Sequence, residues 1–252
     1  MKMKNVLKYA MDIGEWMLKS GAGVSRVEDT IARICKAYGA KEANVFSITS
    51  SIVTTIEDED GEILTQTKRI RYYRTDFEKL DELNQLSRYM CQNLPEEAEV
   101  RQRIAQIKKG RVLLFKEEVI TSAIVAMAWT VFYGGGITEG IIAIISGAMV
   151  AILAKYLKIL APNEMVLNFL LSFFVASLAY LSASFGITHD YGKIIIGNIM
   201  LLVPGVAFVN ALRDMIGGDM MSGILRVCQS VLLAVFLAAG SFMALVFLGG
   251  VL

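Results

Sequence analysis

Hydrophobic and polar side chains follow two different patterns along the chain. Residues 1–112 place apolar positions at helical or strand spacing among many charged ones, whereas residues 113–252 contain long apolar stretches. Each stretch is long enough to cross about 30 Å of hydrocarbon as a helix. The sequence therefore predicts a small soluble α+β domain with a β-hairpin at 1–112. A membrane all-α bundle at 113–252 follows it, with five transmembrane helices at about 117–134, 138–157, 165–186, 193–213 and 223–249.

The first 40 residues predict two helices. Residues 5–19 carry apolar side chains at helical spacing, and glycine-rich residues 21–23 end this helix. Ser25 and Glu28 stand three residues apart, which is the spacing of a capping box, so a second helix is predicted from Ser25. Arg26 is unusual there because a cation in the first turn opposes the helix dipole. Either a surface ion pair or a docking or ligand contact would explain it.

The next segment changes to a strand pattern. Residues 44–56 alternate and predict one strand with Phe46, Ile48, Ile52 and Ile56 on the same face. An acidic turn at 57–61 leads into a second strand at 63–73, which completes a β-hairpin. Because two strands alone are marginally stable, the hairpin should pack against helices, and further helices are predicted from Asp76 and Pro95.

Charged residues support the division into two parts and set an orientation. Residues 1–116 hold 37 of the 49 Lys, Arg, Asp and Glu side chains. The net charge of +1 gives no support for nucleic-acid binding, which requires a basic surface. Basic residues of the short loops fall on one side of the five predicted spans, with Lys193 as the exception. We therefore expect a multi-pass protein of the cytoplasmic membrane with its N-terminus in the cytoplasm and its C-terminus outside.

The residue content argues against an enzyme. His189 is the only histidine, which removes Ser-His-Asp and His-ligated metal chemistry from residues 1–112. The three cysteines are scattered, and the chain lacks a P-loop. The sequence thus predicts no catalytic residue, no metal and no cofactor.

The segment 197–226 carries the most informative polar residues of the membrane half. Pro204 and Gly205 should break the fourth span, because proline lacks a donor and clashes with the preceding turn. Asn198 and Asn210 flank the break, and Arg213, Asp214, Asp219 and Arg226 gather around a short cytoplasmic connection. Polar groups at a broken span can form a substrate site. A structural kink with an interfacial ion-pair network is the other interpretation.

Three segments resemble the threonine/serine exporter family. They are GEWMLKSGAGVSRVEDTIARI, DFEKLDELNQLSR and LVPGVAFVNALRDMIGGDMMSGILR, in the order that this family shows. The resemblance implies secondary export of small metabolites, with threonine and serine as the name-giving solutes. The residues that match its motifs are Gly21, Ala22, Arg26, Glu28, Pro204, Gly205, Asn210, Arg213, Asp214, Asp219, Ser222, Gly223 and Arg226.

The number of spans refines what the resemblance implies. Full-length family members look like ten-span proteins, whereas five spans are predicted here. This is similar to a split form, in which such a subunit works with a smaller membrane subunit. Split relatives are linked to succinate export, so the implied solute is an amino acid or a dicarboxylate. The expected partners are the lipid bilayer, this solute, the smaller subunit and further copies in an oligomer, without nucleic acid. A membrane-anchored hydrolase and a regulatory scaffold are the alternative functions.

Overall fold

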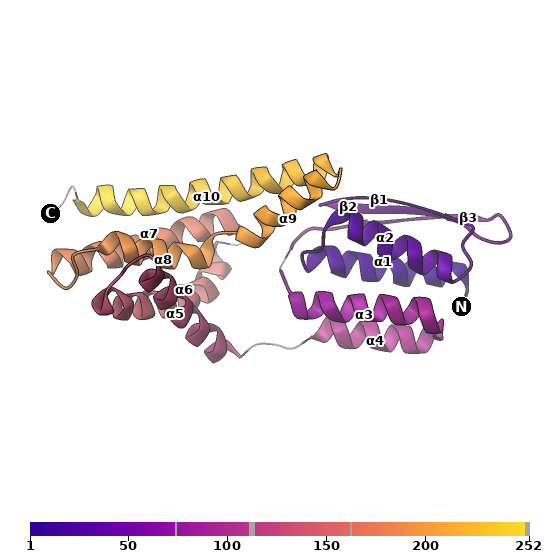
Figure 1. Cartoon of the computed structure of the whole chain (residues 1–252), viewed down its shortest axis with the longest axis horizontal. Coiled ribbons are helices and arrows are strands. Elements are labelled where there is room, and N and C mark those ends of the chain that lie inside the picture. Colours follow the sequence, from indigo (N-terminus) through magenta and orange to yellow (C-terminus); the bar gives the residue numbers. More distant parts are fainter. Residues whose placement is uncertain (74, 111–113, 162, 250–252) are drawn as a thin grey trace. The chain divides into compact units, whose positions relative to one another are not determined.

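The computed structural model describes residues 1–73, 75–110, 114–161 and 163–249 of the chain (Figure 1). It is mostly helical, with one small sheet near the N-terminus. The chain forms two compact units, one of Met1–Val112 with Val206–Val227 and the other of Leu113–Gly205 with Cys228–Leu252. The predicted domain boundary at 112/113 lies outside the described residues. The assignment of a soluble and a membrane domain therefore stays a prediction.

Four helices form most of the first unit: α1 (Met3–Lys19), α2 (Val24–Ala37), α3 (Phe77–Asn93) and α4 (Glu97–Lys109). They bury the apolar stripes expected from the sequence, including Met11 and Met17 of α1 and Ile31 of α2. Asp76 caps α3 because its side chain accepts a hydrogen bond from the Lys79 backbone N–H. These local patterns determine where the helices begin and which face they bury.

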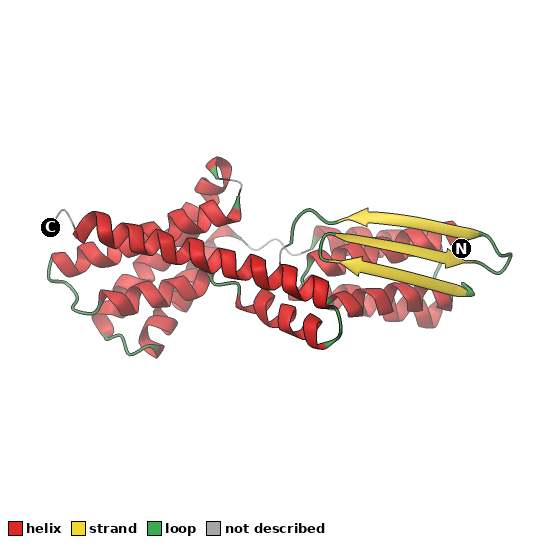
Figure 2. Cartoon of the chain, turned by 90° about the horizontal axis from the view of Figure 1, so that it is seen from above, coloured by secondary structure: helices red, strands yellow, loops and turns green. Residues whose placement is uncertain are grey.

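The sheet has three antiparallel strands, β1 (Glu42–Ile48), β2 (Ser51–Glu57) and β3 (Ile63–Arg69), in the order β1-β2-β3. Figure 2 shows them side by side, and they contact α1 and α2. The hairpin predicted between residues 44 and 73 is present as β2 and β3, but the single strand predicted at 44–56 is wrong. A reversal at residues 49–50 divides it into β1 and β2.

This reversal also changes which side chains face the core. Phe46 pairs with Val53 and Ser47 with Ile52, so an even-numbered residue of β1 shares its face with an odd-numbered residue of β2. Ser47, Ile52 and Ile56 are buried, while Phe46 is 64% exposed. The expectation that Phe46 lies on the same face as Ile52 and Ile56 is therefore wrong.

Six helices follow along the chain: α5 (Phe115–Phe132), α6 (Ile137–Leu160), α7 (Glu164–Ser184), α8 (Tyr191–Leu202), α9 (Gly205–Ile216) and α10 (Met220–Gly249). Among the described residues, the segments Ile137–Ile159, Glu164–Ser184 and Met220–Gly249 are long and apolar enough to cross a membrane. The bent pair α8 and α9 gives a fourth candidate if it forms one span. Helix α5 is not among them, since its first turn carries Lys116, Glu117 and Glu118. The structure thus has three to four candidate spans.

The helices of the second unit approach closely at small residues. A side-chain carbon added to Gly147 would lie 2.6 Å from Cβ of Ala126 on α5. One added to Gly240 of α10 would lie 2.3 Å from the carbonyl oxygen of Phe169 on α7. Glycine at these crossings lets the helix backbones pack together, as is common for helices in lipid.

Candidate functional site

The motif in residues 202–226 forms two helices with a break before them. Helix α8 ends at Leu202, Pro204 follows, and α9 begins at Gly205. Because proline cannot donate a backbone hydrogen bond, the helix is interrupted at Pro204. The backbone N–H of Gly205 donates instead to the carbonyl of Val203, at 2.8 Å.

Helix α9 then turns back into the start of α10. Gly218 has a φ of +99°, a conformation that favours glycine. The Asp219 N–H donates to the Asp214 carbonyl at 2.9 Å, which closes the turn. Gly223 packs so tightly on α9 that an added Cβ would lie 2.8 Å from the carbonyl oxygen of Ala211. Ser222 beside it is buried.

Two side chains of this motif bind the loop between α1 and α2, almost 200 residues earlier in the chain. Asn210 Nδ2 donates to the carbonyl of Gly21, and Arg226 Nη2 donates to the carbonyl of Ala22, both at 3.1 Å. Gly21 has a φ of +97°, which is how the chain leaves α1 sharply. The two sequence motifs therefore meet in one place, within the first unit.

Asp214 lies at the same loop and is held from two sides. Its Oδ2 is 3.1 Å from Arg226 Nη1, and only 4% of the Asp214 side chain and 10% of the Arg226 side chain are exposed. A Cβ added to Gly23 would lie 2.9 Å from Asp214 Oδ1, and the Val24 backbone N–H donates to this carboxylate. Since α2 begins at Val24, Asp214 supplies a negative charge at the positive end of the α2 dipole.

This arrangement replaces the cap expected from the sequence. Helix α2 begins at Val24, one residue before Ser25. Its N-cap is Gly23, which has no side chain that could cap the helix. The predicted capping box between Ser25 and Glu28 is therefore wrong. Glu28 Oε1 accepts a hydrogen bond from the Ser47 backbone N–H instead, and ties α2 to the sheet.

Glu28 and Asp219 bring two carboxylates into one region. Burial raises the pKa of Glu28, and the negative charge of Asp219 raises it further, while the hydrogen bond from Ser47 acts in the opposite direction. Oδ2 of Asp219 is buried and has no hydrogen-bond partner among the described residues. This pair of acids is suited to holding a proton or binding a cationic group.

Asn210, Asp214 and Arg226, the residues 21–24 that they hold, and the pair of Glu28 and Ser47 form what we call the loop network. The structure leaves the other predicted residues outside this network. The side chains of Arg26 and Arg213 are exposed. Asn198 belongs to the second unit, where it is fully buried and its Nδ2 donates to the carbonyl of Ile194 at 2.9 Å. Its Oδ1 has no hydrogen-bond partner in the described part of the chain.

Sequence reasoning missed Gly23 and Ser47 as parts of the network. Gly23 could have been noticed as a glycine directly before a helix that has no polar cap of its own. Ser47 takes part through its backbone N–H, and a backbone group leaves no mark on the sequence. Within the described residues, no group of three or more His, Cys, Asp or Glu could hold a metal ion.

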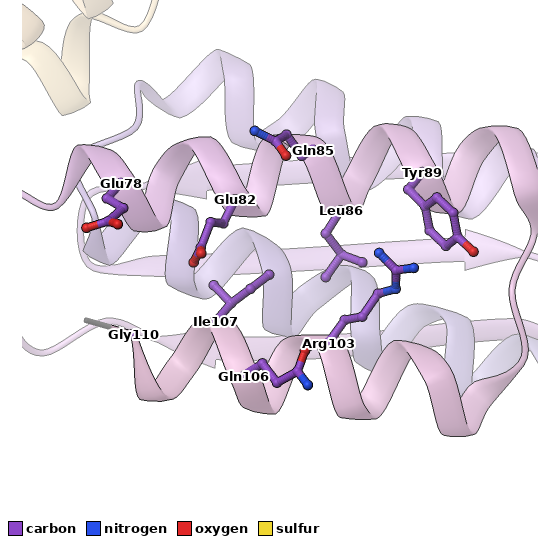
Figure 3. A pocket seen from close by; sticks show the side chains of 9 residues that line it. All are labelled: Glu78, Glu82, Gln85, Leu86, Tyr89, Arg103, Gln106, Ile107 and Gly110. Carbon is purple, nitrogen blue, oxygen red and sulfur yellow. The ribbon is translucent and has the colours of Figure 1, made fainter. Parts of the chain in front are cut away.

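A separate groove of about 540 Å³ lies between α3 and α4 (Figure 3). Leu86 and Ile107 point into the space between the two helices, and Glu78 and Glu82 lie toward one end of it. Arg103 is already engaged, because it pairs with Glu99 at 2.9 Å and lies over the Tyr89 ring. Four of its lining residues, Glu78, Glu82, Gln85 and Leu86, belong to the family segment DFEKLDELNQLSR, whereas Asn210, Asp214 and Arg226 do not line it.

The long apolar helices and the broken pair α8 and α9 define a multi-pass membrane protein. The chain belongs to the ThrE family, described as "Putative threonine/serine exporter", whose sequence profile matches residues 8–248. This match confirms the resemblance found in the sequence.

Two relatives are similar along almost the whole chain. The "Probable succinate transporter subunit YjjP" of Klebsiella aerogenes is 24% identical over 98% of this chain and 96% of its own length. The "Probable threonine/serine exporter" of Mycobacterium tuberculosis is 23% identical over 94% of this chain, which spans 44% of that protein. No solved structure matches the chain.

Proposed function

We propose that the chain is a subunit of a secondary transporter that exports small metabolites across the cytoplasmic membrane. The observation that carries this proposal is the family match over residues 8–248, which includes both motifs of the loop network. Five spans, a cytoplasmic N-terminus and an external C-terminus are the topology we propose for it. The solute is threonine or serine by family, and a dicarboxylate such as succinate is the alternative.

The two relatives support a partner subunit. The relative of matching length is named a transporter subunit, and the exporter of which this chain spans 44% contains more than twice as much sequence. We therefore propose that a smaller membrane subunit completes the transport pathway.

The loop network suggests how the soluble part takes part in transport. Asn210, Asp214 and Arg226 hold the loop between α1 and α2, so a movement of α9 or α10 pulls directly on the start of α2. The buried pair of Asp214 and Arg226 gives these two residues a positioning role. Arg213 is exposed beside them and is suited to contact a solute carboxylate. Asn198 and the break at Pro204 would lie along the solute path.

The test is efflux from bacterial cells that lack their own exporters for these solutes. Cells preloaded with labelled threonine, serine or succinate should release one of them faster when this chain is expressed together with the smaller subunit. A secondary transporter is driven by an ion gradient, which we propose to be that of protons, so dissipating the proton gradient should abolish the difference. Unchanged release of all three solutes, with the chain present in the membrane, would rule out the transporter.

A scaffold without its own solute path is the competing function, because the network could serve structure alone. Arg213→Gln and Asn198→Ala separate the two, with Arg69→Gln, exposed on β3 and outside the family segments, as the control. If the chain forms part of the solute path, efflux by the complex should fall with the first two variants at unchanged expression. If the chain is only a scaffold, efflux by the complex should be normal with all three.

A further inference from the structure

A small pocket of about 170 Å³ lies between α1 and α4, away from the loop network. It has room for about six water molecules at roughly 30 Å³ each. Its walls are rich in positive charge and have one acid, with a buried Tyr9 and Ile104. The lining residues are Lys8, Tyr9, Asp12, Arg101, Ile104, Ala105 and Lys108.

Arg101 lacks the partner that its position would normally provide. Glu97 stands four residues earlier on α4, where an ion pair along the helix is expected. However, Oε2 of Glu97 accepts a hydrogen bond from Asn5 Nδ2 at 2.6 Å, and Oε1 accepts one from the Tyr9 hydroxyl at 3.1 Å. No ion pair of Arg101 is found among the described residues, and its exposed side chain lines the pocket.

Lys8 on α1 likewise lacks the ion pair that its position along the helix would normally provide. Asp12 stands four residues later, but its Oδ1 pairs with Lys68 of β3 at 2.7 Å. Its Oδ2 lies 3.7 Å from Lys108, the third cation of the pocket. The only acid in the wall is thus neutralised from the sheet side, and within the described part of the chain Lys8 forms no ion pair.

We propose that this pocket binds a small anion with two negative charges, of the dicarboxylate or phosphate class. The planar guanidinium of Arg101 suits two oxygens of one carboxylate or phosphate, and the ammonium groups of Lys8 and Lys108 balance the remaining charge. None of its residues belongs to the family segments or to the contacts of Asn210, Asp214 and Arg226, so this site is distinct from the candidate site described above.

The test is isothermal titration calorimetry of the full chain in neutral detergent at low salt, without phosphate in the buffer. Succinate and inorganic phosphate are the two probes, and threonine, which has no net charge, is the comparison. One of the two dianions should bind saturably, and threonine should not bind here. The variant Lys8→Gln/Arg101→Gln should weaken binding about tenfold or more, since one charge-assisted hydrogen bond is worth about 1.5–3 kcal/mol.

The control is Lys41→Gln/Arg69→Gln, which removes the same charge from exposed positions outside the pocket. It should bind as the original chain does. Binding of succinate identifies a dicarboxylate site, and binding of phosphate alone identifies a phosphate site. The proposal is overturned if neither dianion binds, or if binding persists unchanged in Lys8→Gln/Arg101→Gln and therefore belongs elsewhere, such as the transport path.

Discussion

Asp214 and Arg226 form a buried ion pair, with Oδ2 and Nη1 3.1 Å apart, at the loop that joins α1 to α2. Arg226 also donates to the carbonyl of Ala22, and Asp214 lies against Gly23. The pair therefore holds the α9–α10 turn and the start of α2 together, because each partner also contacts the loop.

Removing either member of this pair should destabilise the chain strongly. Asp214→Asn or Arg226→Gln leaves one charge buried without its partner, which typically costs about 3–5 kcal/mol. Equilibrium unfolding in detergent measures the loss. Arg213→Gln, an exposed neighbour, should change stability by less than about 0.5 kcal/mol. The double variant should lose less stability than the sum of the two single losses. A loss equal to that sum would show that the pair is not coupled.

Gly23→Ala should weaken the same network without changing any charge. The added Cβ would lie 2.9 Å from Asp214 Oδ1, while the φ of −68° at Gly23 is open to alanine. The cost thus comes from displacing the carboxylate and not from backbone strain. A lower thermal midpoint is expected. Gly192→Ala is the matched control, because nothing lies within 4 Å of its added Cβ, and equal midpoints for the two variants would contradict the close contact.

Local patterns predicted the helices well but failed where distant segments decide. The helices from Asp76 and of residues 5–19 follow from capping and apolar spacing, which act within a few residues. The face of Phe46 depends on a reversal at residues 49–50. Thr49, Ser50 and Ser51 interrupt the apolar alternation there, but it resumes at the even-numbered Ile52, so the pattern is also compatible with one continuous strand.

The loop network shows the same limit. Both motifs, and the charged residues Asp214 and Arg226, could be singled out from the sequence. The backbone carbonyls of Gly21 and Ala22 accept the hydrogen bonds of Asn210 and Arg226, and every residue has such a carbonyl. The sequence therefore indicated which segments matter, whereas only the structure shows that they bind each other.

Glu28→Gln should stabilise the chain at neutral pH. Burial and then the charge of Asp219 raise the pKa of Glu28 above its ordinary 4.5. A raised pKa means that the stability Glu28 contributes is present at low pH and is lost as pH rises through the pKa of the folded state. Glutamine keeps an oxygen for the Ser47 N–H but carries no charge, so its advantage at pH 7 should vanish below about pH 4.5.

Glu15→Gln provides a control of opposite sign. Burial would raise the pKa of Glu15, but hydrogen bonds from Lys19 and Lys68 outweigh it and lower the pKa overall. Its contribution is therefore present at neutral pH and is lost as pH falls through the pKa of the folded state. In thermal unfolding between about pH 3 and 8, the stability difference from the original chain should change above pH 4.5 for Glu28→Gln and below pH 4.5 for Glu15→Gln, with opposite signs at neutral pH. Parallel curves would contradict the assigned environments.

Gly197→Ala tests whether the second unit depends on the close crossing of α5 and α8. An added Cβ would lie 2.0 Å from Thr130 Oγ1 and 2.7 Å from the Thr130 backbone nitrogen, so the helix backbone itself would have to move. Overpacking of this kind typically costs about 1–3 kcal/mol. Gly140→Ala is the control, since its added Cβ would come no closer than 3.6 Å to any atom. Cross-linking in membranes between one cysteine introduced on α5 and one introduced on α8 should fall in Gly197→Ala and persist in Gly140→Ala. If cross-linking is equal in both variants, α8 does not pack on α5 through Gly197.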